Sequence, residues 1–279
     1  MKYYLLSTIT RILLGKLRKY HKKEDQLLVF SRDFIGEEVF AYGIYEKNEI
    51  DTILASLDFD LTKTNALDIG ANIGNHTLQF SKHFDNVYCF EPNKTIFDVL
   101  TINTRNRTNV HLNNFGLSNE ARQSYLAVPE FNFGGGSVTS SVGTTNTEIS
   151  LRVFDNTIDH EFSFIKIDIE GHELNALKGM VNAITKNKPI ISFELINSES
   201  VAEGLIPFLK KMGYNKFYIP HKRGVFSNSK SFLGIFLNGL FFRPRPELKE
   251  IRKFDKKSYN LILCEREDSN YRIKKENIK

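Results

Sequence analysis

From about residue 66 onward, short apolar segments alternate with patterns typical of helices, and this alternation limits the fold more than any other feature of the chain. The apolar segments expected to form strands are residues 66–69, 86–90, 110–112, 162–169 and 189–195. Strands that alternate with helices are typical of a mostly parallel α/β sheet with helices on both faces. Two further apolar runs, residues 217–219 and 260–264, have no helical pattern between them. We expect these two runs to pair antiparallel and to close the sheet.

The strand expected at residues 66–69 ends in a loop with the sequence Leu67-Asp68-Ile69-Gly70-Ala71-Asn72-Ile73-Gly74. Ligands of open α/β sheets bind at the carboxyl ends of the strands, where glycines let the backbone turn sharply and approach the ligand. The dinucleotide motif G-x-G-x-x-G is not matched, because Asn72 and Asn75 occupy its second and third glycine positions. A P-loop is excluded as well, because the chain contains no Gly-Lys-Ser/Thr sequence. The spacing Asp-x-Gly-x-x-x-Gly suits S-adenosylmethionine instead.

Side chains in and near this loop are the candidate contacts for that methyl donor. Asp68 could accept from the ammonium group of the ligand, directly or through water, and Glu91 could accept from both ribose hydroxyls. Asn72 and Gly74 complete the expected loop contacts. Asn114, after the third strand, is a candidate adenine contact, although backbone groups often bind adenine. In the alternative interpretation, the glycines only make a tight turn between strand and helix.

A second motif occupies the strand expected at residues 162–169 and the turn after it. It reads Phe164-Ile165-Lys166-Ile167-Asp168-Ile169-Glu170-Gly171-His172-Glu173 and continues to Leu177-Lys178-Gly179. With Leu67–Gly74, Phe90-Glu91-Pro92 and Ile190–Glu194, it resembles the FkbM-type family of S-adenosylmethionine-dependent methyltransferases over roughly residues 64–215. The resemblance implies a Rossmann-like class I methyltransferase fold with seven strands, one of them antiparallel. It also implies methyl transfer to a hydroxyl oxygen, and it places Asp68, Gly70 and Glu91 in the donor site.

Two carboxylates in the second motif are candidate catalytic groups. The resemblance implies that Asp168 and Glu170 face the reaction centre, and in extended backbone side chains at this spacing project to the same side. Three roles remain open: one acid acts as a base, both bind a divalent cation such as magnesium, or both only hydrogen-bond the acceptor. His172, at a position where the family accepts several residue types, is the third candidate. Glu194 could add a metal ligand or form an ion pair with Lys166.

The net charge of +5 is distributed unevenly along the chain. Residues 1–24 hold seven Lys/Arg and one acid, and residues 221–257 hold ten Lys/Arg and three acids. Such basic segments can contact nucleic acid, anionic lipid or an anionic glycan. The first segment has apolar residues at helical spacing, namely Leu5, Leu6, Ile9, Ile12, Leu13 and Leu17. The pattern favours a helix that packs on the body as a cap, and the alternative is a helix that lies on a membrane surface.

We therefore expect a basic amphipathic helix at 1–24, a methyltransferase domain at 25–268 with a basic aromatic insertion at 221–257, and a charged tail at 269–279. The insertion is a candidate lid, interfacial patch or subunit contact. Two distant cysteines exclude a disulfide framework and a Cys-based zinc site, and they suit the cytoplasm. No run of eighteen uncharged apolar residues occurs, so we expect no membrane-spanning helix. Arg11 interrupts the first apolar stretch and no small-residue cleavage site follows it, so we expect no signal peptide. If the first segment lies on a membrane, as in the alternative to the cap, the contact is peripheral and at the inner face.

The function predicted from these observations is methyl transfer from S-adenosylmethionine to a hydroxyl of a carbohydrate, in a surface glycan or a glycosylated metabolite. One alternative is a nucleic-acid acceptor, which the basic segments suggest. The absence of an Asp/Asn-Pro-Pro-aromatic motif and the separation of those segments argue against it, so no nucleic-acid partner is expected. The other alternative is a catalytically silent fold that binds a glycan or an assembly partner. The intact motif residues argue against that reading.

Overall fold

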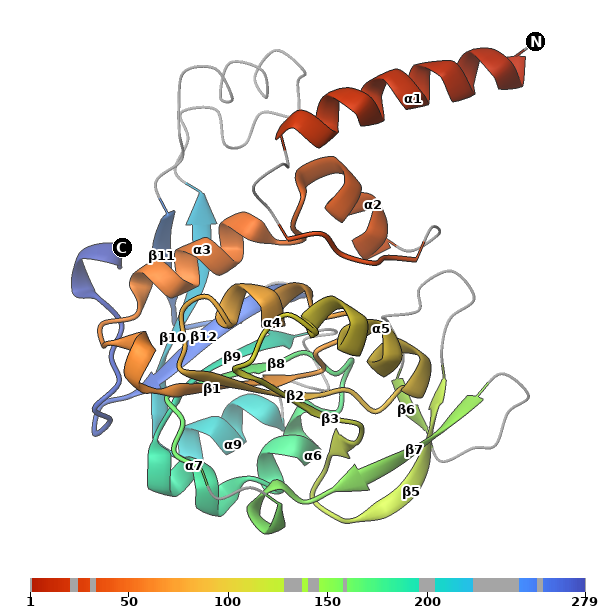
Figure 1. The fold of residues 1–279 in the computed structure, drawn as a ribbon. Helices are drawn as coiled ribbons and strands as arrows, with labels where there is room; N and C mark the ends of the chain where they lie inside the picture. The colour runs from red at the N-terminus through yellow and green to blue at the C-terminus, as the bar shows by residue number, and fades with distance from the viewer. Residues whose placement is uncertain are drawn as a thin grey trace.

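The computed structural model describes residues 2–20, 25–30, 34–127, 137–139, 146–157, 160–195, 204–222, 246–254 and 258–278. Its centre is an eight-stranded sheet with the order β11-β10-β12-β9-β8-β1-β2-β3 (Figure 1). Five strands pair in parallel: β1 (Asn65–Ile69), β2 (Asn86–Phe90), β3 (Val110–Asn113), β8 (Phe164–Ile167) and β9 (Ile190–Leu195). Antiparallel pairs add β10 (Tyr214–Lys222), β11 (Pro246–Ile251) and β12 (Tyr259–Arg266).

This sheet confirms the predicted α/β class and corrects the number of strands. β10 and β12 pair antiparallel as expected, and β12 also pairs antiparallel with β9. β11 lies within the segment expected to be an insertion and pairs with β10 at the edge of the sheet. Its Leu248 is fully buried between charged neighbours, so the segment has the one apolar face that an edge strand needs. The sheet therefore has eight strands instead of seven, and two of them run against the rest.

Helices cover both faces of the sheet. On one face, Leu67 and Ile167 pack with residues of α6 (Glu173–Lys178), α7 (Val181–Asn187) and α9 (Leu205–Lys211). On the other, Ala66 and Phe164 pack with α3 (Lys47–Ser56), α4 (Asn75–Phe80) and α5 (Lys94–Thr104). Because both faces are buried, the central strands are nearly continuous apolar runs. Short 3-10 helices are formed by Leu61–Lys63, Phe154–Asn156 and Lys275–Asn277.

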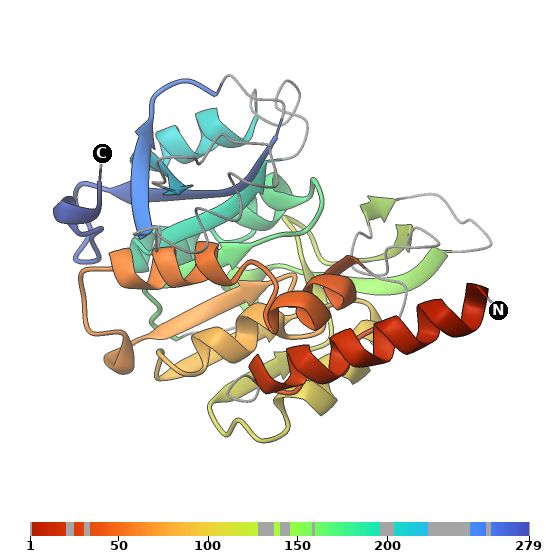
Figure 2. The same ribbon diagram turned by 90° about the horizontal axis from the view of Figure 1, so that it is seen from above.

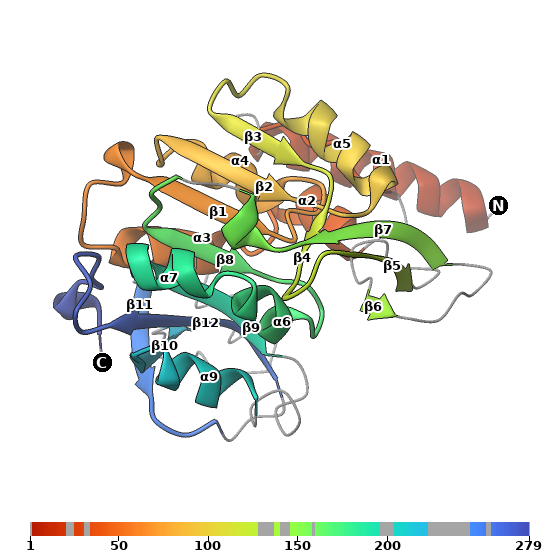
Figure 3. The ribbon, with the colours of Figure 1, turned by 90° about the horizontal axis from the view of Figure 1, so that it is seen from below.

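A second, four-stranded sheet extends beside the carboxyl ends of the main strands (Figure 3). It consists of β4 (Gly116–Leu117), β5 (Arg122–Ala127), β6 (Ser137–Thr139) and β7 (Asn146–Arg152), in the order β4-β7-β5-β6. The apolar pattern of the sequence does not predict this sheet, because its strands contain few apolar residues among polar ones. Its buried residues Leu126, Ile149 and Leu151 form a small core of their own.

The N-terminal helix α1 (Lys2–Tyr20) reaches beyond α2 (Phe34–Tyr42) and away from the sheet (Figures 1 and 2). Its apolar side chains at positions 4, 5, 6, 9, 12 and 13 are 46–83% exposed, whereas Leu14 is half-buried. The prediction that this helix packs these residues on the body as a cap is therefore wrong. Among the described residues, no helix has both the length and the apolar character needed to cross a membrane.

Two segments of the predicted domain organisation remain, the basic insertion at 221–257 and the charged tail at 269–279. Of the expected basic insertion, residues 223–245 and 255–257 lie outside the described residues. In the expected charged tail, Ile273 is buried and forms an isolated bridge with Leu57.

Candidate active site

A cavity opens at the carboxyl ends of four neighbouring strands. Its polar wall comes from the segments that follow β1, β2 and β8 and from the end of β9, and it consists of Gly70, Asn72, Glu91, Asn93, Asp168, Glu170, His172 and Glu194. Six of the nine residues predicted for the site are in this wall. The other three, Asp68, Gly74 and Asn114, do not line the cavity.

Gly70 is required where the first and second motifs cross. It has a φ of +80°, and a Cβ atom placed on it would lie 1.9 Å from the backbone oxygen of Asp168. No side chain fits at that distance, so the end of β1 can approach the end of β8 only because residue 70 is glycine. The crossing brings the two motifs, almost a hundred residues apart in sequence, into one wall.

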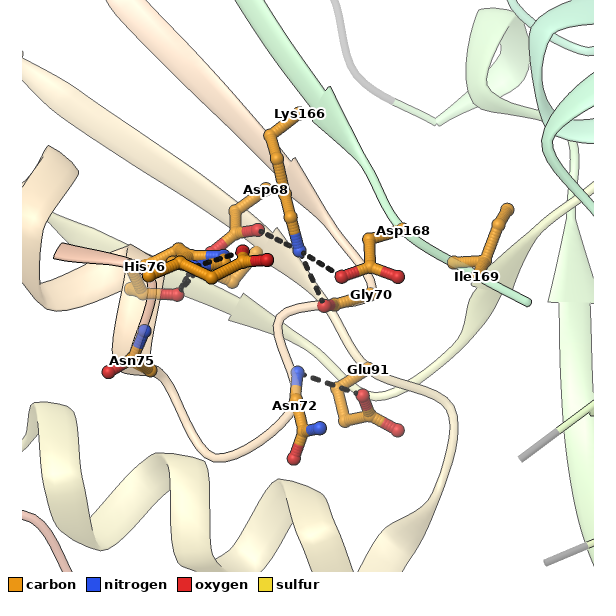
Figure 4. A network of polar contacts seen from close by, with 12 residues as sticks. Asp68, Gly70, Asn72, Asn75, His76, Glu91, Lys166, Asp168 and Ile169 are labelled. Atoms are coloured by element: carbon orange, nitrogen blue, oxygen red, sulfur yellow. Dashed lines mark hydrogen bonds and ion pairs between the residues drawn. The ribbon is translucent and has the colours of Figure 1, made fainter. Parts of the chain in front are cut away.

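Glu91 lies at the end of β2 and orders the glycine loop. One carboxylate oxygen accepts from the backbone N–H of Asn72 at 3.0 Å (Figure 4), and the other accepts from that of Asn93 at 2.9 Å. Asn72 has a left-handed φ of +50°, which asparagine tolerates better than most residues. Burial raises the pKa of Glu91 to about 7, while the two backbone hydrogen bonds oppose that shift. The carboxyl group is therefore fixed at the cavity wall and titrates near neutrality.

Beneath the wall, a buried lysine links the first and second motifs (Figure 4). The Lys166 Nζ lies 3.1 Å from Asp168 Oδ2, 3.8 Å from Asp68 Oδ1 and 3.5 Å from the Gly70 carbonyl oxygen. Asp68 is fully buried and also accepts from the Thr77 hydroxyl at 2.6 Å. The register explains this, because Asp68 and Lys166 are direct neighbours on β1 and β8 and point to the same face.

Gly74 and Asn114 support the loops around the cavity. Gly74 precedes α4 with a φ of +93° and packs closely against Leu100 of α5. The Asn114 side chain donates to the backbone oxygens of Glu91 and Pro92 at 2.9 and 3.2 Å. In these positions, Gly74 and Asn114 support the backbone of the loops whose other residues line the cavity.

Two carboxyl groups face each other across β8 and β9. Asp168 and Glu194 share a hydrogen bond. Burial and the Asp168 charge raise the pKa of Glu194 to about 9, whereas Lys166 helps hold the pKa of Asp168 below its usual value against the effect of burial. At neutral pH, Glu194 thus keeps its proton and donates it in a hydrogen bond to ionised Asp168. The expected ion pair between Glu194 and Lys166 is replaced by this acid pair.

The chain turns directly after β8, so the extended spacing assumed for Asp168 and Glu170 does not apply. Glu170 has a φ of +51° and Gly171 a φ of +94°. The Glu173 carboxylate accepts from the backbone N–H of Ile169 at 3.3 Å and of Gly171 at 3.0 Å, and this stabilises the turn. Both acids nevertheless line the cavity, and burial raises the pKa of Glu170.

His172 lies at the start of α6 and borders the cavity on the side of the second sheet. Its Nε2 is 3.0 Å from the Ser118 hydroxyl and its Nδ1 is 3.3 Å from the Asn175 amide. Burial lowers its pKa, so the ring is neutral at neutral pH. Both ring nitrogens thus have partners within the chain, which fix the orientation of the ring. Neither partner belongs to the Asp168–Glu194 pair.

Part of the remaining wall comes from segments that the sequence reasoning did not connect with the site. Phe34, Ile35 and Tyr45 line the cavity from the N-terminal side, and Leu117, Leu126, Val138 and Leu151 line it from the second sheet. One signal for the first group was available in the glycine loop. Asn75, where a dinucleotide motif would have glycine, exchanges two hydrogen bonds with the backbone of Tyr45, at 2.9 and 3.0 Å.

A divalent metal site is less compatible with this arrangement than an organic ligand. An ammonium group already contacts Asp168, and the neighbouring Glu194 is protonated, so the pair offers little negative charge to a second cation. Across the described parts of the chain, no group of three or more His, Cys, Asp or Glu residues has the geometry to hold a metal ion.

The strand order and the polar wall at the strand ends together define a Rossmann-like α/β protein of the class I methyltransferase type. Within that class, the family model of the methyltransferase FkbM domain matches residues 68–216. The chain belongs to the FkbM methyltransferase family. The match contains both motifs and excludes α1, α2, α3, β11 and β12.

Individual relatives share parts of this chain. The hexuronic acid methyltransferase AglP of Haloferax volcanii is 31% identical over 156 residues, which are 55% of this chain and 60% of AglP. The crystal structure of an FkbM methyltransferase from Methylobacillus flagellatus covers 88% of this chain and 50% of its own, at 17% identity and a TM-score of 0.44. The crystal structure of the Streptococcus mutans protein SMU.1697c in complex with SAH covers 77% of this chain and 94% of its own, at 9% identity and a TM-score of 0.41.

Proposed function

We propose that this protein transfers a methyl group from S-adenosylmethionine to a hydroxyl oxygen of a carbohydrate. The observation that carries the proposal is the single cavity that joins the Gly70 loop and Glu91 to the Asp168–Glu194 acid pair. Family membership supports methyl transfer as the reaction. The relative AglP, which is named for a hexuronic acid, supports a sugar as the acceptor class.

The residues around Gly70 fit the methyl donor. When bound, S-adenosylmethionine supplies a methyl group on a positively charged sulfur. The backbone at Gly70 has no side chain between it and the cavity, and the Glu91 carboxylate keeps lone pairs for the two ribose hydroxyls. Of the acids on this side of the cavity, Glu170 is outside the Asp168–Glu194 pair, and its carboxylate would favour a cationic ligand. Asp68, being fully buried, would act on the ligand through Lys166 and the loop backbone.

The Asp168–Glu194 pair would provide a base that takes the proton of the sugar hydroxyl. The acceptor hydroxyl would donate a hydrogen bond to the ionised Asp168 carboxylate, which Lys166 and the Glu194 proton hold in place. As the new C–O bond forms, the hydroxyl proton would move to that carboxylate or to Glu170, whose raised pKa makes it the stronger base. A bound magnesium ion is the competing account of how the hydroxyl is activated.

The acceptor would enter through a groove beside the cavity. This groove shares Phe34 and Tyr45 with the cavity, and it continues past Glu38 and Tyr42 toward Tyr259. Aromatic rings next to carboxylates suit a sugar, because the rings contact its C–H face and the carboxylates accept from its hydroxyls. Phe34 and Tyr45 precede the part that matches the family model, so this segment is where we expect acceptor choice to differ among relatives.

Calorimetric titration with S-adenosylmethionine and S-adenosylhomocysteine, with and without magnesium, tests the donor part of the proposal. We expect micromolar binding that magnesium does not change. Absence of binding by a folded, ligand-free sample would contradict the proposal and favour a silent fold. A screen of sugar acceptors, including uronic acids, then tests the acceptor class. Transfer to RNA that weakens steeply with salt would instead support a nucleic-acid acceptor.

A further inference from the structure

The helix α1 exposes an apolar stripe that its own chain does not cover. Leu5, Leu6, Ile9, Ile12 and Leu13 lie at helical spacing on one side, and each is between 46% and 63% exposed. The helix contacts the body through the flank that bears Leu14, which is half-buried, and it runs past α2 without burying the stripe (Figures 1 and 2). An uncovered apolar stripe of this length indicates an interaction surface.

The charge of α1 limits what can cover the stripe. The helix Lys2–Tyr20 contains five Lys/Arg and no acidic residue, and the described Arg11 and Lys16 are both exposed. A second copy of α1 would set five positive charges against five others with no carboxylate between them. A surface of anionic lipid provides what the helix lacks, namely negative charge next to an apolar layer.

We propose that α1 lies in the surface of a membrane that contains anionic lipids, with its apolar stripe inserted and its cations at the headgroups. With nineteen residues at about 1.5 Å each, the helix would make a contact about 28 Å long. α2, which follows it in the chain, supplies Phe34 and Ile35 to the cavity wall. Docking through α1 would therefore hold the cavity close to the lipid surface. This inference does not depend on the proposed reaction.

Sedimentation of the full chain with lipid vesicles tests the proposal. We expect binding to phosphatidylcholine vesicles that contain phosphatidylglycerol, weaker binding to phosphatidylcholine alone, and weakening by salt. The Ile9→Glu variant places a charge in the stripe, and Ser7→Glu places the same charge on the opposite side of the helix, at another exposed position. Ser7→Glu should weaken binding roughly fivefold through the change in charge, whereas Ile9→Glu should weaken it at least about tenfold more.

Both substituted residues are exposed, so neither variant should change the thermal unfolding midpoint, and circular dichroism checks this. Equal loss of binding in the two variants would overturn the proposal, as would equal binding to both kinds of vesicle. Ultracentrifugation provides an independent check. A dimer that Ile9→Glu separates into monomers would show that a second copy covers the stripe, and the proposal would then be wrong.

Discussion

Lys166 organises the polar centre of the molecule. Burial alone would lower its pKa, but Asp168 and Asp68 together raise it above its ordinary value, so the side chain stays charged. The lysine forms ion pairs with one acid beneath the cavity and one acid in its wall. It also explains why two carboxyl groups as close as Asp168 and Glu194 divide into one charged and one protonated partner.

At the residue scale, the Glu91→Gln variant tests the donor site. The amide cannot offer a charged acceptor to both ribose hydroxyls, so we expect affinity for S-adenosylhomocysteine to fall about tenfold to a hundredfold. Because the pKa of Glu91 is about 7, wild-type affinity should rise between pH 6 and pH 8, and that of the variant should stay flat. Calorimetry measures both quantities. Glu161→Gln, at an exposed position, is the control, and unchanged affinity in Glu91→Gln would remove this residue from the site.

The Asp168→Asn variant tests the proton acceptor. Asparagine keeps the size of the side chain but cannot take a proton, so we expect kcat to fall about 10²- to 10⁴-fold while affinity for the donor changes little. Single-turnover assays with the acceptor from the screen, alongside calorimetry, separate the two effects. The exposed Asp51→Asn variant serves as control. Full activity of Asp168→Asn would show that this group is neither base nor metal ligand.

The protonated Glu194 predicts a specific dependence of stability on pH. Its pKa rises from an ordinary value of 4.5 to about 9 in the folded protein, so the folded state holds this proton more tightly than the unfolded chain does. The corresponding stability is fully present below pH 4.5 and is lost as pH rises through 9. Glu194→Gln, which resembles the protonated acid, should therefore resist unfolding at pH 9 better than wild type does. Thermal scans from pH 6 to 10 measure this, and parallel curves for the two proteins would refute the assignment.

At the scale of elements, the site depends on the crossing of the β1–α4 loop and the end of β8. Gly70 and Gly171 both have positive φ, but a Cβ at Gly70 would meet Asp168 backbone, whereas a Cβ at Gly171 would meet nothing within 4 Å. Gly171→Ala should cost only the left-handed strain, about 1–2 kcal/mol. Gly70→Ala should cost more, because the two loops must move apart, and it should also abolish donor binding.

Chemical denaturation and calorimetry of these two alanine variants measure the contrast. Equal losses of unfolding free energy in the two variants would mean that the β1–α4 loop and the end of β8 are not in close contact in solution. The same element-scale argument explains Asn75, which joins α4 to Tyr45 and so attaches the N-terminal segment to the cavity.

At the scale of the whole molecule, the core and α1 contribute differently to stability. Leu177 is fully buried among the strands and helices of one face, whereas Leu13 is 54% exposed on α1. We expect Leu177→Ala to lower the free energy of unfolding by about 2–5 kcal/mol, and Leu13→Ala to change it by less than about 0.5 kcal/mol. Urea unfolding of both variants measures this. A large loss in Leu13→Ala would show that α1 packs on the body after all.

The sequence by itself determined the parallel α/β sheet, the antiparallel closing pair and most of the polar cavity wall. It could do so because strand–helix alternation, a glycine loop and the residues that end each strand are local patterns, and parallel strands bring their ends to one edge. Sequence reasoning missed β11, because two apolar residues, Leu248 and Ile251, among charged ones give little signal. It also missed the second sheet, because its strands have few apolar residues among polar ones and so give a weak signal.

Only the tertiary structure decided which groups of the site meet and in which charge state. Asp68 and Lys166 are neighbours because of strand register. Glu194 holds the proton of the acid pair because burial and the Asp168 charge raise its pKa, while Lys166 helps keep Asp168 ionised. Phe34 and Tyr45 reach the cavity through the packing of an N-terminal segment. These relations depend on distances between residues far apart in the chain and on their burial. Neither quantity is present in a local pattern, so the sequence could name the acids but not assign the proton among them.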